Sequence, residues 1–104
     1  MSTRILIVDD LLPNLNLLEV KLAAEYYDVV RATSGKQALE IAQNEEIDLV
    51  LLDAVMPGMN GFETCEKLKT NPKTWHVPVV MVTALEETRN RIRGLEAGAD
   101  DFIT

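Results

Sequence analysis

Short runs of consecutive apolar residues recur along the chain, separated by longer segments in which apolar and polar residues follow a helical spacing. The runs cover residues 5–8, 29–30, 49–52, 79–82 and, more weakly, 102–103. Within a run the apolar residues do not alternate with polar ones. This is typical of strands that are buried on both faces, and it predicts a parallel sheet covered by helices.

The segments between these runs carry signals for helix starts. Pro13 suits the first turn of a helix, and Ser34 and Asn60 are followed three residues later by Gln37 and Glu63, the spacing of a capping box. The predicted inward stripes are Leu15, Leu18 and Leu22 for the first helix, Ala38, Ile41 and Ala42 for the second, and Cys65 and Leu68 for the third.

A fourth helix is predicted around residues 86–97, with Ile92 and Leu95 facing the sheet and Gly98 as a left-handed cap. Five strands then alternate with four helices, and a fifth helix after the last strand is missing. This alternation predicts an α/β fold with a doubly wound, five-stranded parallel sheet. The two usual strand orders place strand 1 beside strand 4 or beside strand 3. In the second order, 2-1-3-4-5, ligands bind at the carboxyl ends of strands 1 and 3.

Length and composition are those of one acidic globular domain. The chain has 104 residues, of which 47% are apolar, and 17 acidic against 10 basic residues give a net charge of −7. Since the basic residues form no cluster, direct binding of nucleic acid or of an anionic membrane surface is not expected. No apolar stretch is long enough for a membrane span or a signal peptide. With Cys65 as the single cysteine, an internal disulfide is excluded, and a cytoplasmic location is expected.

Three aspartates directly follow two of the predicted strands. Asp9 and Asp10 come after the first strand and Asp53 after the third. If they share one crevice, their carboxylates repel one another unless pKa values rise or a cation or basic side chains compensate. Mg²⁺ suits an all-oxygen pocket. The tight loop after Asp53 would place the Val55 carbonyl near this cation. The Thr83 hydroxyl, at the end of the fourth strand, would reach a phosphoryl oxygen. Because a carboxylate beside Mg²⁺ can form an acyl phosphate, the spacing suggests a site of metal-assisted aspartyl phosphorylation.

Plainer interpretations of the same residues stay open on spacing alone. An aspartate at a strand end often forms a turn or caps a helix, and Thr83 also suits a strand as a β-branched residue. An acidic pair without metal could perform general acid–base work. No accompanying base or substrate cleft is visible for such work.

Four motifs give the sequence a wider resemblance. They are ILIVDD at residues 5–10, LLDAVMPGMNG at 51–61, PVVMVTA at 78–84 and GLEAGADDF at 94–102. In this order and spacing, the whole chain resembles the receiver domain of two-component response regulators. The stretch around residues 17–27, together with Asn14, is further similar to the N-terminal receiver of PleD-type diguanylate cyclases. The resemblance implies the flavodoxin-like receiver fold with strand order 2-1-3-4-5.

The resemblance also implies a phosphorylation-dependent signalling module rather than an enzyme with an external substrate. Asp53 would accept a phosphoryl group from a sensor histidine kinase or a phosphotransfer protein. Asp10, Asp53 and the Val55 carbonyl would ligate Mg²⁺, and Asp9 would hold the ion mainly through water. Thr83 would contact the phosphoryl group, and Phe102 would move inward as the switch aromatic.

The partners implied beyond the kinase are a covalently linked output domain, such as a diguanylate cyclase, and a second copy in a homodimer. The family's lysine after the fifth strand and its fifth helix are absent from residues 1–104. The chain is therefore expected to be a receiver domain cut short after that strand.

Two other functions remain as alternatives. One is a Mg²⁺-dependent phosphohydrolase with Asp53 as nucleophile, although phosphatases of the haloacid dehalogenase type use a second acid where this chain has Val55. The other is a pseudo-receiver that binds partners without phosphorylation. The intact acidic trio argues against it.

Overall fold

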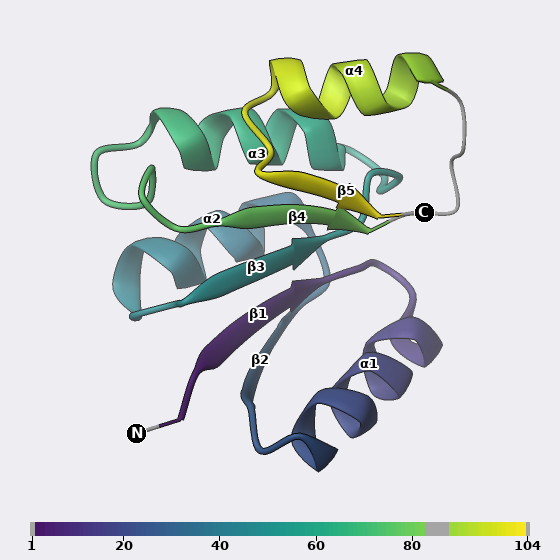
Figure 1. Ribbon diagram of the computed structural model, residues 1–104, viewed down its shortest axis with the longest axis vertical. Helices are drawn as coiled ribbons and strands as arrows, with labels where there is room; N and C mark the ends of the chain where they lie inside the picture. The colour runs from purple at the N-terminus through teal and green to yellow at the C-terminus, as the bar shows by residue number, and fades with distance from the viewer. Residues whose placement is uncertain (1, 83–87, 104) are drawn as a thin grey trace.

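The computed structural model describes residues 2–82 and 88–103, which form one parallel sheet with helices on both faces (Figure 1). The strands are β1 (Arg4–Val8), β2 (Asp28–Ala32), β3 (Leu49–Leu52), β4 (Val79–Val82) and β5 (Asp101–Ile103). The helices are α1 (Leu12–Ala24), α2 (Gly35–Asn44), α3 (Gly61–Thr70) and α4 (Thr88–Glu96). The order in the sheet is β2-β1-β3-β4-β5, so the predicted fold class and strand order are confirmed.

The strand register brings the ends of β1 and β3 level with each other. Val8 lies opposite Leu52 in the parallel pair, and the Asp53 N–H donates to the Val8 carbonyl at 3.0 Å. The residues that follow these two strands therefore leave the sheet side by side. This is the edge at which ligands bind in doubly wound sheets.

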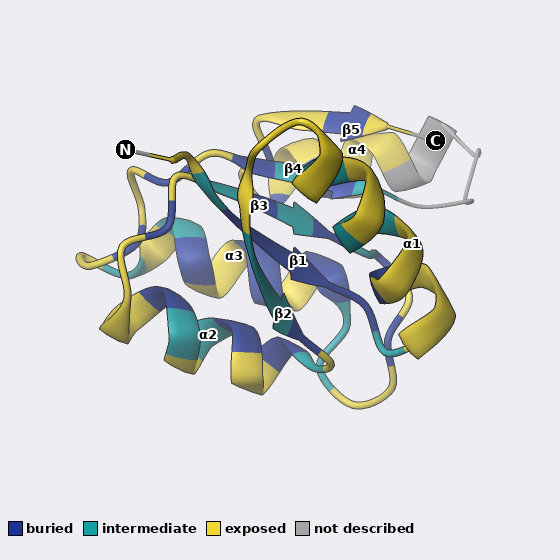
Figure 2. Ribbon diagram, turned by 90° about the horizontal axis from the view of Figure 1, so that it is seen from below, coloured by how far each residue is buried: buried dark blue, intermediate teal, exposed yellow. Residues whose placement is uncertain are grey.

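Each face of the sheet has its own apolar core. The larger core lies under α2, α3 and α4, while a smaller one, with Leu15 at its centre, lies under α1. Figure 2 shows this difference as mostly buried residues on the inner sides of α2 and α3 and a largely exposed α1. The predicted inward stripes of the first three helices are confirmed, since their residues are buried or half-buried. Among the described residues, no helix has the length and hydropathy to cross a membrane.

The predicted capping boxes differ in detail. At α3 the box is complete, because Asn60 Oδ1 accepts the Glu63 N–H at 2.9 Å and Glu63 Oε1 accepts the Asn60 N–H at 3.4 Å. At α2, Ser34 Oγ accepts the Gln37 N–H at 3.1 Å, but Gln37 Oε1 accepts the N–H of Thr33, one residue earlier. In both cases side chains satisfy amides that a helix start leaves without partners.

The predicted orientation of α4 is wrong. Ile92 and Leu95 are 49% and 64% exposed, whereas Gly94 and Ala97 are buried against the sheet. A Cβ atom at Gly94 would lie 2.9 Å from Cδ2 of Phe102. The helix therefore packs closely on this ring with its small residues Gly94 and Ala97. Its larger apolar side chains, Ile92 and Leu95, face the solvent. The cap is as predicted, since Gly98 has a φ of +93°.

α1 ends with a residue in an unfavourable backbone conformation. Tyr26 has a φ of +67° and is 88% exposed. Its N–H donates to the Ala23 carbonyl and the Tyr27 N–H donates to the Leu22 carbonyl, the pattern of a Schellman motif. Glycine normally occupies this position because the left-handed region costs other residues energy.

We expect Tyr26→Gly to raise the free energy of unfolding by about 0.5–1 kcal/mol, because it relieves the left-handed strain and gives up little packing. Urea unfolding measures the change. Tyr27→Gly is the matched control, since Tyr27 lacks the positive φ and is only 40% exposed. This control should lose stability. An equal loss in both variants would show that the Tyr26 side chain stabilises the turn.

Candidate functional site

Three carboxylates meet at the carboxyl edge of the sheet. One oxygen each from Asp9, Asp10 and Asp53 lies within 4.8 Å of the others. The register of β1 and β3 causes this, since the two strands end side by side (Figure 1) and the aspartates follow directly after Val8 and Leu52. The clustering predicted from the sequence is therefore present, and Asp9 is buried while Asp10 and Asp53 are half-buried.

Asp9 is held by two hydrogen bonds, one to each of its carboxylate oxygens. Oδ1 accepts the Leu11 N–H at 2.9 Å, and Oδ2 accepts from Nδ2 of Asn14 at 3.1 Å. Both donors belong to the start of α1. The buried carboxylate thus has a fixed orientation, set by the turn that joins β1 to this helix.

The Asp53 carboxyl has a pKa raised to about 6 from its ordinary value of 3.8. Burial is the largest cause, and the negative charges of Asp9 and Asp10 add to it. The backbone N–H groups of Val55 and Ala54 act in the opposite direction, with the Val55 N–H lying 3.3 Å from Asp53 Oδ1. Near neutral pH, Asp53 is therefore mostly ionised but held among like charges.

The donor set fits a hard divalent cation. Three carboxylates within reach of one ion supply oxygen ligands, and Mg²⁺ is normally held by one or two carboxylates together with water. The negative charges of Asp9 and Asp10 add to burial, the larger cause, in raising the pKa of Asp53. The backbone of Val55 lies beside Asp53 through the hydrogen bond described above. A cation at this position would offset the repulsion from Asp9 and Asp10, which adds to the effect of burial on the pKa of Asp53.

Of the two predicted switch residues, Phe102 lies within the described part of the chain. Phe102 is 6% exposed, packed under Gly94 of α4, and the guanidinium carbon of Arg91 lies 5.7 Å from the centre of its ring. Its aromatic ring thus occupies an inward position in this structure. Thr83 lies outside the described residues.

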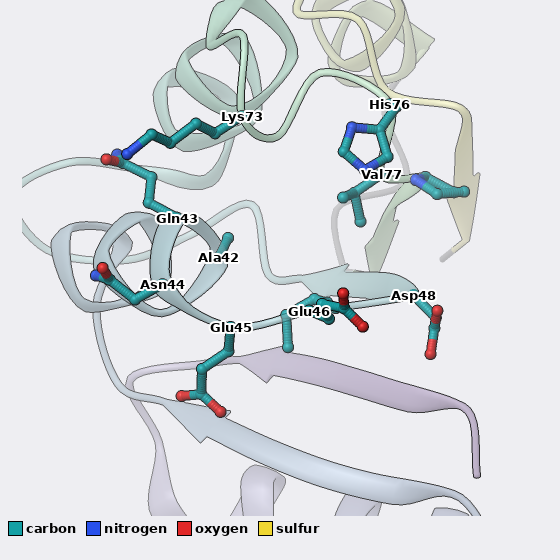
Figure 3. A pocket seen from close by; sticks show the side chains of 11 residues that line it. Ala42, Gln43, Asn44, Glu45, Glu46, Asp48, Lys73, His76 and Val77 are labelled. Atoms are coloured by element: carbon teal, nitrogen blue, oxygen red, sulfur yellow. The ribbon is translucent and has the colours of Figure 1, made fainter. Parts of the chain in front are cut away.

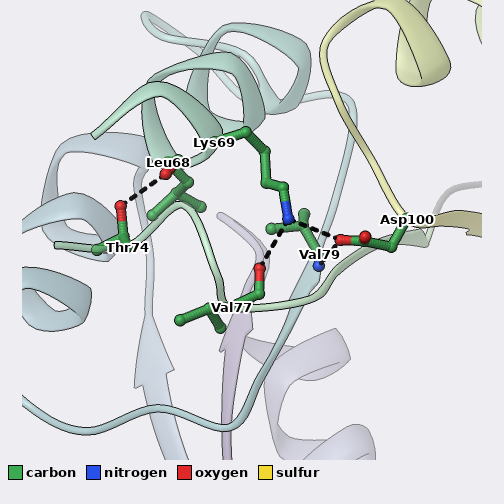
Figure 4. A network of polar contacts seen from close by, with 6 residues as sticks. All are labelled: Leu68, Lys69, Thr74, Val77, Val79 and Asp100. Carbon is green, nitrogen blue, oxygen red and sulfur yellow. Dashed lines mark hydrogen bonds and ion pairs between the residues drawn. The ribbon is translucent and has the colours of Figure 1, made fainter. Parts of the chain in front are cut away.

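A polar network holds the beginning of β4 in place (Figure 4). Nothing in the sequence indicated this network. Lys69 Nζ donates to the Val77 carbonyl at 3.1 Å and to Asp100 Oδ2 at 2.9 Å, and the same oxygen accepts the Val79 N–H at 2.8 Å. Burial acts to raise the pKa of Asp100, but the Val79 N–H and the Lys69 ammonium outweigh it and hold this pKa below its ordinary value. The network joins α3, β4 and the start of β5.

A depression of about 500 Å³ lies at the edge of the sheet opposite the aspartates (Figure 3). Its rim carries charges of both signs, including Glu45, Asp48 and Lys73, and His76 also lines it. Glu45 is already paired with Arg4 at 2.8 Å. The depression brings together no set of groups comparable to the aspartate cluster, so the chemistry is assigned to the carboxyl edge.

The raised pKa of Asp53 leads to a prediction about the stability of the folded state in the absence of divalent cations. Because the folded state binds the Asp53 proton more tightly than the unfolded state, stability is lost as the pH rises from 3.8 through about 6. We expect Asp53→Asn to unfold at a higher temperature than the wild type above pH 6. This advantage should shrink as the pH falls through this range and vanish below 3.8, where the Asp53 carboxyl is protonated in both the folded and the unfolded chain.

Thermal unfolding in a chelating buffer at several pH values checks this expectation. Asp101→Asn, which removes an exposed carboxylate on β5, is the control and should gain nothing comparable. A pH-independent difference between wild type and Asp53→Asn would contradict the raised pKa.

The comparisons with known proteins agree with this geometry. The family model described as "Response regulator receiver domain" matches residues 5–104. "Response regulator PleD" of Caulobacter vibrioides is 55% identical over 104 residues, which is 100% of this chain and 23% of that protein. The chain thus spans about a quarter of the length of this relative.

Solved structures give the same result. The chemotaxis protein CheY4 of Vibrio cholerae superposes with a TM-score of 0.95 at 26% identity, covering 100% of this chain and 87% of that one. A CheY-like receiver domain protein from Methanospirillum hungatei gives a TM-score of 0.91 at 34% identity, covering 99% of this chain and 81% of that one.

Proposed function

The chain belongs to the response regulator receiver domain family, and from that premise we propose that Asp53 accepts a phosphoryl group with the help of Mg²⁺. Receiver domains are signalling modules, so the phosphorylated aspartate is a signal and not a step in metabolite turnover. The observation that carries the proposal is the convergence of the Asp9, Asp10 and Asp53 carboxylates at one edge of the sheet.

Asp10, Asp53 and the Val55 carbonyl would hold the ion, and Asp9 would act on it through water. The resemblance implies this division, and the contacts of Asp9 are compatible with it, because its two oxygens each accept a hydrogen bond from the start of α1. When bound, Mg²⁺ supplies positive charge that offsets the carboxylates and the phosphoryl oxygens.

Asp53 is suited to act as the nucleophile. A carboxylate oxygen of Asp53 would attack phosphorus, forming a P–O bond while the P–N bond of a phosphohistidine breaks. The electron pair of that bond leaves on the imidazole nitrogen, which takes up a proton. The reaction needs an ionised Asp53, and its pKa of about 6 leaves the carboxylate predominantly ionised at neutral pH.

Phosphorylation would then be read out at the surface formed by α4 and β5. A phosphoryl group adds about 1.5 to 2 negative charges and new acceptor oxygens, and we propose that Thr83 contacts it. Phe102, which packs under Gly94, would couple the site to α4. The donor would be a sensor histidine kinase or a phosphotransfer protein in the cytoplasm.

We further propose that residues 1–104 are part of a longer receiver, linked to an output domain that it controls. The length of the PleD relative supports this, since the matched segment is 23% of that protein. A diguanylate cyclase is the output favoured by the sequence resemblance, and a homodimer would be the active form.

Incubation with Mg²⁺ and acetyl phosphate, followed by intact mass spectrometry, tests the proposal. A chain that gains the mass of one phosphoryl group supports it. Steady release of phosphate without an adduct would instead indicate the phosphohydrolase, for which Val55 stands in place of a second acid. An unmodified chain would indicate a pseudo-receiver.

A further inference from the structure

Asn14 connects the first turn of α1 to the aspartate cluster. Its side-chain Nδ2 donates to Asp9 Oδ2 at 3.1 Å, across five positions of the sequence. Asn14 is an exposed residue, whereas Asp9 is only 7% exposed. The contact therefore runs from the surface into the cluster.

The start of α1 depends on Asp9 in an unusual way. The residue at the N-cap is Leu11, whose side chain makes no capping hydrogen bond. The Leu11 N–H donates instead to Asp9 Oδ1 at 2.9 Å. Asp9 thus accepts one bond from the turn and one from Asn14, and these two donors define the plane of its carboxylate.

Both donors are neutral groups, so the aspartate cluster keeps its full negative charge. A carboxylate oxygen has two lone pairs, so each oxygen of Asp9 can still accept a hydrogen bond from a water molecule. Asn14 is neutral, so it orients Asp9 without offsetting the charge that attracts a cation. A lysine in its place would compete with the cation electrostatically.

We propose that Asn14 is a positioning residue of the cation site, which keeps the Asp9 carboxylate directed toward the water shell of the ion. The inference rests on the proposed function, in which Asp9 acts on Mg²⁺ through water. Hydrogen bonds from neighbouring side chains to the groups that surround a metal ion fix the orientation of those groups and so set metal affinity.

The test is titration of the full chain with Mg²⁺ by calorimetry. Asn14→Ala removes the donor, and Asn14→Leu removes it while retaining side-chain bulk. We expect both to weaken Mg²⁺ binding by about tenfold. Asn16→Ala is the matched control because Asn16 is also exposed, lies in the same helix and lines a separate surface with Glu19 and Val20. This control should bind Mg²⁺ like the wild type.

Two further measurements separate positioning from a structural role. In a chelating buffer, the urea midpoints of the Asn14 variants should match that of Asn16→Ala. In the presence of acetyl phosphate they should need more Mg²⁺ for half-maximal phosphorylation but reach the wild-type rate when saturated.

Unchanged Mg²⁺ affinity in both Asn14 variants would overturn the inference and leave the proposed function standing. A loss of stability in the chelating buffer that accounts for the weaker binding would also overturn it. If the wild type binds no Mg²⁺, the proposed function and the inference fail together.

Discussion

Asp53→Asn is expected to take up no phosphoryl group from acetyl phosphate, whereas the wild-type chain gains one. The substitution keeps the shape of the side chain but replaces the attacking carboxylate by a neutral amide, which is a poor nucleophile. The fold should persist, because the change also removes a charge that burial, Asp9 and Asp10 disfavour. Intact mass spectrometry after incubation with Mg²⁺ measures the result directly.

The control is Asp101→Asn, which removes an exposed aspartate at the start of β5 and should be phosphorylated at the wild-type rate. Circular dichroism must show that both variants are folded, because only then does the comparison of their phosphorylation report on the acceptor. A phosphoryl group on Asp53→Asn would mean that another residue is the nucleophile, and peptide mapping would identify it. That outcome would remove the role assigned to Asp53.

Much of this fold was predictable because its signals are local and repeated. Each buried strand is marked by a run of apolar residues, and Ser34 and Asn60 mark helix starts that the structure confirms. The general rule for doubly wound sheets left two strand orders open, and the resemblance to receiver domains supplied the order 2-1-3-4-5 that the structure confirms. The carboxylate cluster was predictable only together with that order, because it places the ends of β1 and β3 side by side.

The orientation of α4 was not predictable from the size of its apolar residues. Ile92 and Leu95 have the spacing of an inward stripe, yet the helix packs through Gly94 and Ala97. The reason is Phe102 on the neighbouring strand β5, whose ring fills the space under Gly94. Because this ring belongs to the strand that follows α4 and not to the helix itself, helical periodicity alone could not reveal how close α4 lies to the sheet.

The contacts that orient the side chains of the site could not be predicted from the sequence either. Asn14 has no motif that marks it as a partner of Asp9, and the pairing depends on how the turn at Leu11 folds back. Lys69 and Asp100 are thirty-one positions apart and meet only because α3 and the start of β5 both border β4. Such side-chain pairs follow from three-dimensional packing and are not carried by local sequence patterns.

Gly61 has a larger role than its place in the LLDAVMPGMNG motif suggests, and Gly61→Ala is expected to be strongly destabilising. An added Cβ would overlap the carbonyl oxygen of Asp53 and lie 2.7 Å from Cα of Ala54. Backbone atoms cannot move aside as a flexible side chain can. We expect a loss of roughly 3 kcal/mol in the free energy of unfolding, at the upper end for overpacking, measured by urea unfolding.

The same substitution should weaken Mg²⁺ binding, because relief of the overlap must displace Asp53 or the start of α3. Gly58→Ala is the matched control in the same loop. Gly58 has a φ of +73° and open space around its Cβ position, so alanine there should cost about 1–2 kcal/mol through backbone strain. Asp53 should stay in place in this control. If Gly61→Ala retained wild-type stability and Mg²⁺ affinity, α3 would be free to move away from Asp53, and close backbone packing would not be what positions the acceptor.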